Sequence, residues 1–250
     1  MTYNAKPLGR VTFLDTLPHE ARAAFSQLGT PRRYASGELL IREGEHVPEL
    51  MVLHEGLVKV TARLDDQRVA LLDIRMDGDV VGEFATLDFG PRSATVTACS
   101  QVTATVVQRH ELEPANPGIW KALCCMVAGR ARRSVRWRLD FGGQPVDVRL
   151  ARVLVELAES YGRPDPGRPG SGAVLIDVDL SQSEFAELIG STRNTVHKHL
   201  ALLRDDGIIR TGERRTYVRD LRRLREKARL CVRVDRGREH GTGQRARISR

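Results

Sequence analysis

The chain has 250 residues, of which 41% are hydrophobic and only 5% aromatic, so its cores must be mainly aliphatic and wholesale disorder is excluded. The length suggests one large or two modest domains. Lysine and arginine exceed aspartate and glutamate by 8, which favours nucleic acid or an anionic membrane surface as partner. This excess lies at one end, because residues 204–250 contain 16 basic and 7 acidic residues.

The cysteines and the apolar segments disfavour a disulfide-rich, a metal-binding, a secreted or a membrane-spanning protein. The four cysteines are Cys99, Cys124, Cys125 and Cys231. They show neither CxxC nor Cys/His spacing, so we expect no disulfide framework and no metal site. Residues 1–10 lack the apolar core of a signal peptide, and the longest apolar run, residues 122–128, is too short to span a bilayer. We therefore expect a cytoplasmic protein that does not bind a membrane.

The first half of the chain changes from helical to strand-like patterning. Residues 10–28 have apolar residues at helical spacing. Between residues 31 and 110, short stretches rich in β-branched residues alternate with glycine turns, which predicts a small β-barrel or roll. Asn116 and Pro117 then suit the cap and the first residue of a long helix, which ends at Gly142–Pro145.

The long helix has a stripe of apolar and small residues at spacings of three and four. A stripe of this kind commonly pairs with a partner helix, so it predicts a homodimer. Packing of the helix on its own barrel is the alternative, and one stripe could serve both. Its members are Ile119, Trp120, Leu123, Cys124, Val127, Ala131, Ser134, Val135 and Leu139.

The second half reads as a smaller domain followed by a tail. Residues 148–161 predict an amphipathic helix, 163–172 a loop rich in Pro and Gly, and 174–178 a short strand. Two compact helices, a hairpin over 208–218 and a last helix from residue 220 follow. From about residue 226 the composition predicts a basic, disordered tail.

Residues 181–204 have the pattern of a helix-turn-helix. Ser181 and Glu184 match a capping box, Gly190 suits the turn between the helices, and Ser191 or Thr192 can cap the second helix. That helix would enter the major groove of DNA with its N-terminal side chains. An ordinary helical hairpin with a solvated face is the alternative. The predicted DNA-binding residues are Ser181, Ser191, Thr192, Arg193, Asn194, Thr195, His197 and Lys198.

Residues 78–98 predict a site for a small anion. Gly82 permits close approach of the backbone, and a helical turn beginning at Glu83 would present N–H groups. Arg92 supplies a cationic fork and Ser93 a hydroxyl, which both suit a phosphate. Glu83 can accept hydrogen bonds from sugar hydroxyls. The alternative for Arg92 is a surface salt bridge.

From about Leu14 to Leu224 the sequence resembles the cyclic-AMP receptor protein / fumarate-nitrate regulator (Crp/Fnr) transcription factors. The resemblance rests on the cassette Gly82-Glu83…Arg92-Ser93-Ala94, the helix start at Asn116-Pro117, the helix-turn-helix, and the glycines Gly37, Gly44, Gly56 and Gly78. It implies an α+β fold with an N-terminal cyclic-nucleotide-binding β-roll, a long dimerisation helix and a C-terminal winged helix-turn-helix. It also implies a non-enzymatic regulator that dimerises along residues 116–141, binds double-stranded DNA and contacts RNA polymerase.

The resemblance further implies a cyclic nucleotide, cyclic AMP above others, as effector rather than a catalytic cofactor. Glu83 would hold the ribose 2′-hydroxyl, Arg92 and Ser93 the cyclic phosphate. Arg130 and Ser134 would line the pocket, with Ser134 near the purine. Val135 stands where the cyclic-AMP branch presents a second hydroxyl from the partner subunit. The implied ligand-binding residues are Gly82, Glu83, Arg92, Ser93, Arg130 and Ser134; no catalytic residue or metal ligand is implied.

We expect a β-roll effector domain over 1–115, a dimerisation helix and hinge over 116–143, a winged helix-turn-helix over 144–225 and a tail over 226–250. Two alternatives stay open: the same scaffold with no ligand or a non-nucleotide effector, and a cyclic-nucleotide-binding subunit that does not bind DNA. An iron–sulfur sensor is disfavoured, because residues 1–100 contain only Cys99. Walker, GxSxG, HExxH and GxGxxG motifs are absent, which disfavours a hydrolase or transferase.

Overall fold

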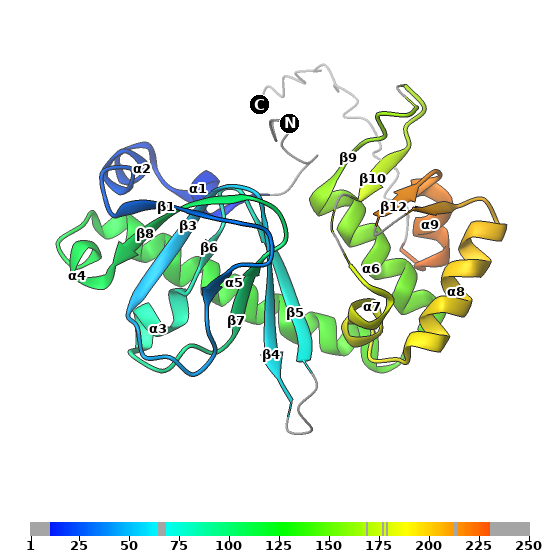
Figure 1. Ribbon diagram of the computed structural model, residues 1–250, viewed down its shortest axis with the longest axis horizontal. Helices are drawn as coiled ribbons and strands as arrows, with labels where there is room; N and C mark the ends of the chain where they lie inside the picture. Colours follow the sequence, from blue (N-terminus) through cyan, green and yellow to red (C-terminus); the bar gives the residue numbers. More distant parts are fainter. Residues whose placement is uncertain are drawn as a thin grey trace, which may run out of the picture.

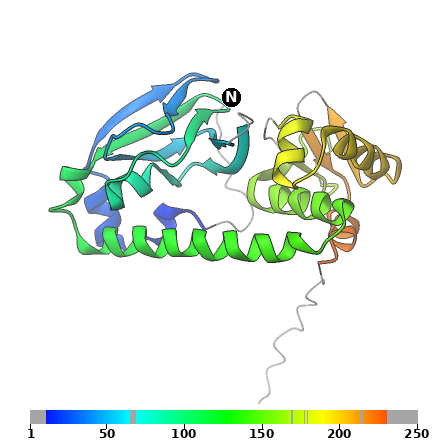
Figure 2. The same cartoon turned by 90° about the horizontal axis from the view of Figure 1, so that it is seen from below.

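The structure is a computed structural model that describes residues 11–64, 69–168, 170–176, 178, 180–212 and 215–230. A roll of β-strands and a smaller, mainly helical domain lie side by side (Figure 1). Helix α5 (Pro117–Gly142) runs the length of the β-roll and leads to the second domain, as Figure 2 shows. None of the helices in the described part of the chain is long and apolar enough to cross a membrane.

The β-roll confirms the expected α+β architecture. Within the described residues it consists of two four-stranded antiparallel sheets, of order β1-β8-β3-β6 and β2-β7-β4-β5. Alternate apolar side chains of both sheets meet in one core, with Leu53, Val58 and Val102 at its centre. The strands are β1 (Thr30–Tyr34), β2 (Leu39–Ile41), β3 (Glu49–Glu55), β4 (Leu57–Arg63), β5 (Val69–Met76), β6 (Val80–Val81), β7 (Thr95–Ala98) and β8 (Val102–Gln108).

Short helices join α5 on the outer side of the roll. Helices α1 (Phe13–Thr16), α2 (His19–Phe25) and α4 (Arg109–Leu112) surround the first turns of α5, while α3 (Glu83–Asp88) follows β6. The rings of Phe13 and Phe25 meet edge to face at 5.6 Å. Ile119 and Leu123 are fully buried in the same cluster. The start of α5 is therefore part of the core of the β-roll domain.

The apolar stripe of α5 divides between two faces, so its residues do not all lie on the side that a partner helix could contact. Leu123 is buried against the chain's own helices, whereas Val135 and Leu139 are exposed. An α-helix turns by about 100° per residue, so residues spaced by three and four share a face. The outward face consists of Cys124, Ala128, Ala131, Val135 and Leu139. This exposed face has small and apolar side chains and is accessible to a second copy of the chain.

The second domain places a helix-turn-helix beside a small sheet of order β11-β12-β10-β9. Strand β9 lies where a loop was expected, because the chain leaving α6 pairs with the edge of β10. Gly162 is required at this junction, since a Cβ there would lie 2.0 Å from the Ala158 carbonyl oxygen. The elements are α6 (Val146–Tyr161), β9 (Gly162–Pro164), β10 (Val174–Ile176), α7 (Gln182–Leu188), α8 (Arg193–Asp205), β11 (Ile209–Gly212), β12 (Arg215–Val218) and α9 (Leu221–Lys227).

The expected tail begins later than the composition indicated. Helix α9 continues to Lys227, and Leu224 and Ala228 are buried in the core of the second domain. The start of the tail at residue 226 is therefore corrected, because α9 needs its last turn to pack against α6. Residues 231–250, the rest of the predicted tail, lie outside the described residues.

The β4–β5 ribbon joins the two domains. Leu71 and Ile74 of β5 belong to the apolar cluster of the second domain, together with residues of α6 and α7. The Tyr161 hydroxyl on α6 donates a hydrogen bond of 2.6 Å to the Ile74 carbonyl oxygen. The ribbon is thus part of the β-roll sheet and of the interface with the second domain at the same time.

Candidate ligand pocket and nucleic-acid interface

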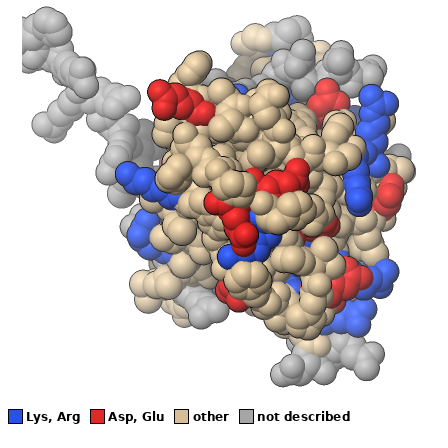
Figure 3. Space-filling view, turned by 90° about the vertical axis from the view of Figure 1, so that its left-hand side faces the viewer, with Lys and Arg blue, Asp and Glu red and all other residues tan. Residues whose placement is uncertain are grey.

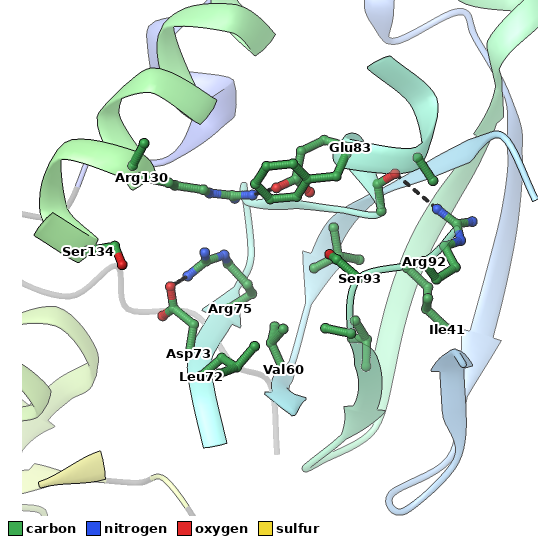
Figure 4. Close-up of a pocket in the computed structure, with 17 residues that line it drawn as sticks. Ile41, Val60, Leu72, Asp73, Arg75, Glu83, Arg92, Ser93, Arg130 and Ser134 are labelled. Carbon is green, nitrogen blue, oxygen red and sulfur yellow. Dashed lines mark hydrogen bonds and ion pairs between the residues drawn. The ribbon is translucent and has the colours of Figure 1, made fainter. Parts of the chain in front are cut away.

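A cavity of about 350 Å³ lies between α3, the β4–β5 ribbon and α5. All six predicted ligand residues line it, although they come from the cassette and from a helix much further along the chain (Figure 4). The cavity is lined by Ile41, Val60, Leu72, Asp73, Arg75, Val81, Gly82, Glu83, Phe84, Ala85, Arg92, Ser93, Ala94, Val96, Arg130, Ala131 and Ser134.

Arg92 is held at one end of the cavity by backbone carbonyls. Its Nη1 donates to the carbonyl oxygens of Glu49, at 2.6 Å, and of Gly82, at 2.9 Å. Gly82 has a φ of 82°, and a Cβ on it would lie 2.6 Å from the Arg92 Nη1. The Arg92 Nη2 also lies 3.8 Å from the Glu49 Oε1. Arg92 is only 4% exposed, so this ion pair is buried and not the surface salt bridge of the alternative. Burial lowers its pKa, yet an arginine stays a cation at neutral pH.

Glu83 and Arg130 form a buried ion pair across the cavity. The Arg130 Nη1 contacts the Glu83 Oε1, and its Nη2 donates to the Val80 carbonyl oxygen at 2.9 Å. Burial, and then the nearby charge of Arg75, lower the pKa of the Arg130 guanidinium. Because the partners lie on α3 and α5, the ion pair fixes the carboxylate of Glu83 relative to the long helix. Glu83 is therefore a positioned hydrogen-bond acceptor in the middle of the cavity.

The helix-turn-helix has the predicted caps. Ser181 accepts a hydrogen bond from the Glu184 backbone N–H at 3.2 Å, and the Glu184 carboxylate accepts one from the Ser181 N–H at 2.7 Å, which confirms the capping box. Thr192, rather than Ser191, caps α8, because its hydroxyl accepts from the Thr195 N–H. Gly190 between the helices has a φ of 58°.

Helix α8 is amphipathic, with one face buried in the domain and the other exposed. Val196, Leu200 and Leu203 are buried against the rest of the domain. The exposed predicted DNA-binding residues are Thr192, Arg193, Asn194, His197 and Lys198. Ser181, Ser191 and Thr195 are half-buried, and Ser181 and Thr195 already take part in helix caps. The structure thus brings a cation and an amide together at the exposed start of α8.

Comparisons with known proteins cover both domains. A model of the cyclic nucleotide-binding domain matches residues 31–115, and a model of the Crp-like helix-turn-helix domain matches residues 148–227. A CRP-like cAMP-activated global transcriptional regulator from Mycobacterium tuberculosis is 31% identical over 225 residues, which are 89% of this chain and 98% of that protein. The chain belongs to the Crp/Fnr family. It is a DNA-binding transcriptional regulator with a cyclic-nucleotide-binding domain.

Further Crp/Fnr relatives agree in fold and extent. The transcriptional regulator LdrP from Thermus thermophilus is 32% identical over 197 residues, 79% of this chain and 96% of that protein. The crystal structure of TTHB099, a CRP-family transcriptional regulator from the same species, superposes with a TM-score of 0.66 at 27% identity. That match covers 79% of this chain and 96% of the solved one.

Two charged residues that the sequence interpretation missed also line the pocket of this Crp/Fnr protein. Asp73 and Arg75 of β5 form an ion pair, and the Arg75 Nη1 also donates to the Ile74 carbonyl oxygen at 3.1 Å. Burial by itself lowers the pKa of Arg75, but the carboxylates of Asp73 and Asp79 outweigh it and raise the pKa. The available signal was a pair of opposite charges at positions i and i+2 of an apolar strand, which share one face.

The described surface of the β-roll domain that lies away from the second domain has no concentration of basic residues (Figure 3). Figure 3 views the molecule from the side of α2 and α4, where acidic and basic residues are scattered among uncharged ones. The described residues on this face form no continuous basic surface of the kind that follows a nucleic-acid backbone. Among the described residues, no group of His, Cys, Asp and Glu could hold a metal ion.

Proposed function

We propose that this Crp/Fnr protein acts as a homodimer whose binding to DNA is controlled by a 3′,5′-cyclic purine nucleotide in the β-roll cavity. The observation that carries the proposal is the convergence of Gly82, Glu83, Arg92, Ser93, Arg130 and Ser134 on that one cavity. A phosphate can be buried only beside a compensating charge, and the buried guanidinium of Arg92 supplies it.

The cyclic phosphate and the ribose of a cyclic nucleotide each have a fitting group. Arg92 and Ser93 would bind the cyclic phosphate, and Gly82 lets the backbone approach it. Glu83, held by Arg130, would accept the hydrogen bond of the ribose 2′-hydroxyl. These contacts are common to all 3′,5′-cyclic ribonucleotides. Cyclic AMP is the reference ligand, because the relative from Mycobacterium tuberculosis is named as cAMP-activated.

The DNA would be read by two copies of α8 in one dimer. The outward face of α5, with Ala131 and Val135, supports dimerisation because its small and apolar side chains are exposed. A two-fold dimer requires inverted half-sites about one helical turn apart. RNA polymerase is the further partner that we propose for the DNA-bound dimer.

Binding to a randomised DNA pool, with and without cyclic nucleotides, tests this proposal. We expect the full-length protein to select an inverted repeat, and a cyclic nucleotide to raise the affinity for the selected site. Calorimetry on the same preparation would show whether the nucleotide binds in the absence of DNA. Selection of an inverted repeat that no cyclic nucleotide affects would contradict control by such an effector.

A further inference from the structure

The end of the cavity opposite Arg92 and Ser93 contains a carboxylate–guanidinium pair that the phosphate and ribose contacts do not use. Figure 4 shows Arg92 and Ser93 on one side, and Asp73 and Arg75 beside Ser134 on the other, with Glu83 in between. A cyclic nucleotide with its phosphate at Arg92 and its ribose at Glu83 would direct its base towards this ion pair.

A β-bulge explains why the pair faces the cavity. Val60 of β4 pairs with Asp73 and Thr61 pairs with Leu71, so Leu72 is an extra residue in β5. Leu71 packs in the cluster shared with α6 and α7, whereas Leu72 and Asp73, on the other side of the bulge, line the cavity. Bulges re-aim side chains in this way. Regular alternation then resumes, which returns Arg75 to the side of Asp73.

The pair can still recognise a ligand. Arg75 is 7% exposed, and the Asp73 Oδ1 accepts a hydrogen bond from the Ile74 N–H at 2.7 Å. A carboxylate has two oxygens that each accept more than one hydrogen bond, and a guanidinium carries several N–H donors on one plane. Val60 and Leu72 add apolar surface, and Leu72 is 54% exposed, so a base in the cavity can pack on it.

The two purines differ in how they match this arrangement. Guanine has the acceptor O6 next to the donors N1–H and N2–H, while adenine has one exocyclic donor next to the acceptor N1. Two adjacent donors fit the two oxygens of a carboxylate, and arginine is the usual partner of guanine O6. Adenine would offer Asp73 a single donor and place the N1 lone pair near a negative charge.

Building on the proposed effector site, we infer that Asp73 and Arg75 read the base and select guanine. The preferred ligand of the cavity is then 3′,5′-cyclic GMP rather than cyclic AMP. The phosphate and ribose contacts proposed above stay the same for either nucleotide, so this selectivity comes only from the base end of the cavity.

Isothermal titration of the full-length protein with three cyclic nucleotides tests this selectivity. We expect cyclic GMP to bind about tenfold or more tightly than cyclic AMP, because a matched bidentate contact discriminates bases by this order. Cyclic IMP keeps O6 and N1–H but lacks the 2-amino group, so its affinity should lie between the two. Asp73→Asn should remove most of the preference, because an amide carries one acceptor and one donor.

Asp88→Asn is the matched control. Asp88 is exposed at the end of α3, does not line the cavity, and accepts a hydrogen bond from the Gly90 N–H that an asparagine oxygen can also accept. This control should leave all three affinities unchanged.

The outcomes separate the two proposals. Equal or tighter binding of cyclic AMP to the wild type would overturn the guanine assignment and leave the proposed function in place. Failure of all three nucleotides to bind would overturn the proposed function itself. A preference for cyclic GMP that survives in Asp73→Asn would show that other groups read the base. If that variant does not fold, the ranking on the wild type decides alone.

Discussion

Lys59 of β4 and Glu184 of α7 form an ion pair of 2.6 Å across the boundary between the β-roll and the helix-turn-helix. The same carboxylate accepts the Ser181 N–H at the start of α7, so one side chain both caps the helix and binds it to the ribbon. The next residue along β4, Val60, lines the cavity between α3, the β4–β5 ribbon and α5. The β4–β5 ribbon therefore contacts the cavity with one face and the DNA-binding domain with the other.

Lys59→Met should weaken the contact between the domains. Both partners are mostly buried, so we expect a loss of about 1–2 kcal/mol in the free energy of unfolding, measured with chemical denaturant. Amide hydrogen exchange of α7 should accelerate as well. Lys227→Met, which breaks an exposed ion pair with Asp206, is the control and should have a much smaller effect. Equal effects of the two substitutions would contradict a structural role of Lys59.

The same ion pair should weaken in acid. Burial raises the pKa of Glu184, but the hydrogen bonds from Lys59 and Ser181 outweigh it and hold the pKa below its ordinary value of 4.5. A carboxylate with a depressed pKa in the folded state contributes stability above its unfolded pKa, and this contribution is lost as the pH falls through the folded value. The stability difference between wild type and Glu184→Gln should therefore shrink below pH 4.5. A difference that does not depend on pH would count against this assignment.

Replacement of Arg92 should affect both ligand and fold. Arg92→Ala removes the charge proposed for the phosphate, so cyclic-nucleotide affinity should fall by about tenfold or more. It also removes the Arg92 donor from the carbonyl oxygens of Glu49 and Gly82, of which Gly82 keeps the Thr86 hydroxyl, so the stability of the ligand-free protein should decrease. Arg92→Lys keeps the charge but not the fork and should be intermediate. Titration calorimetry with unchanged affinity for Arg92→Ala would exclude the phosphate role.

The two faces of α5 predict opposite outcomes for two similar substitutions. Val135→Glu places a charge on the exposed face, so we expect monomers in sedimentation and an unchanged circular dichroism spectrum. Leu123→Glu buries a charge in the core of the β-roll domain and should unfold it. Val69→Glu, at an exposed position on β5, is the control and should stay dimeric. A Val135→Glu protein that sediments as a dimer would place the interface elsewhere.

Arg193 and Lys198 should differ in how they affect DNA selection. Arg193 is exposed in the first turn of α8, where it could form a bidentate contact to guanine. Arg193→Ala should cost about 1–3 kcal/mol and relax the preference at one base pair of each half-site. Lys198→Ala should lower affinity for all sequences alike and reduce the salt dependence. Selection from a randomised pool at two salt concentrations distinguishes the two, and an unchanged sequence preference in Arg193→Ala would make it a phosphate contact.

Features set by short stretches of chain were predictable from the sequence. The capping box of Ser181 and Glu184 and the turn at Gly190 depend on residues within one or two helical turns, so spacing alone locates them. The succession of β-roll, long helix and helix-turn-helix followed from the change in apolar period along the chain. The cassette from Gly82 to Ser93 is equally local, and it lies at the cavity where the sequence placed it.

Only the tertiary structure decided which neighbours these elements meet. The stripe on α5 divides between two faces because Leu123 packs against the apolar residues of α1 and α2. Strand β9 forms because its backbone pairs with the edge of β10. The bulge at Leu72 depends on the register between β4 and β5, which the sequence of either strand does not specify. That register turns Asp73 towards the cavity while Leu71 faces α7, because a strand exposes alternate residues to opposite sides and one extra residue exchanges them.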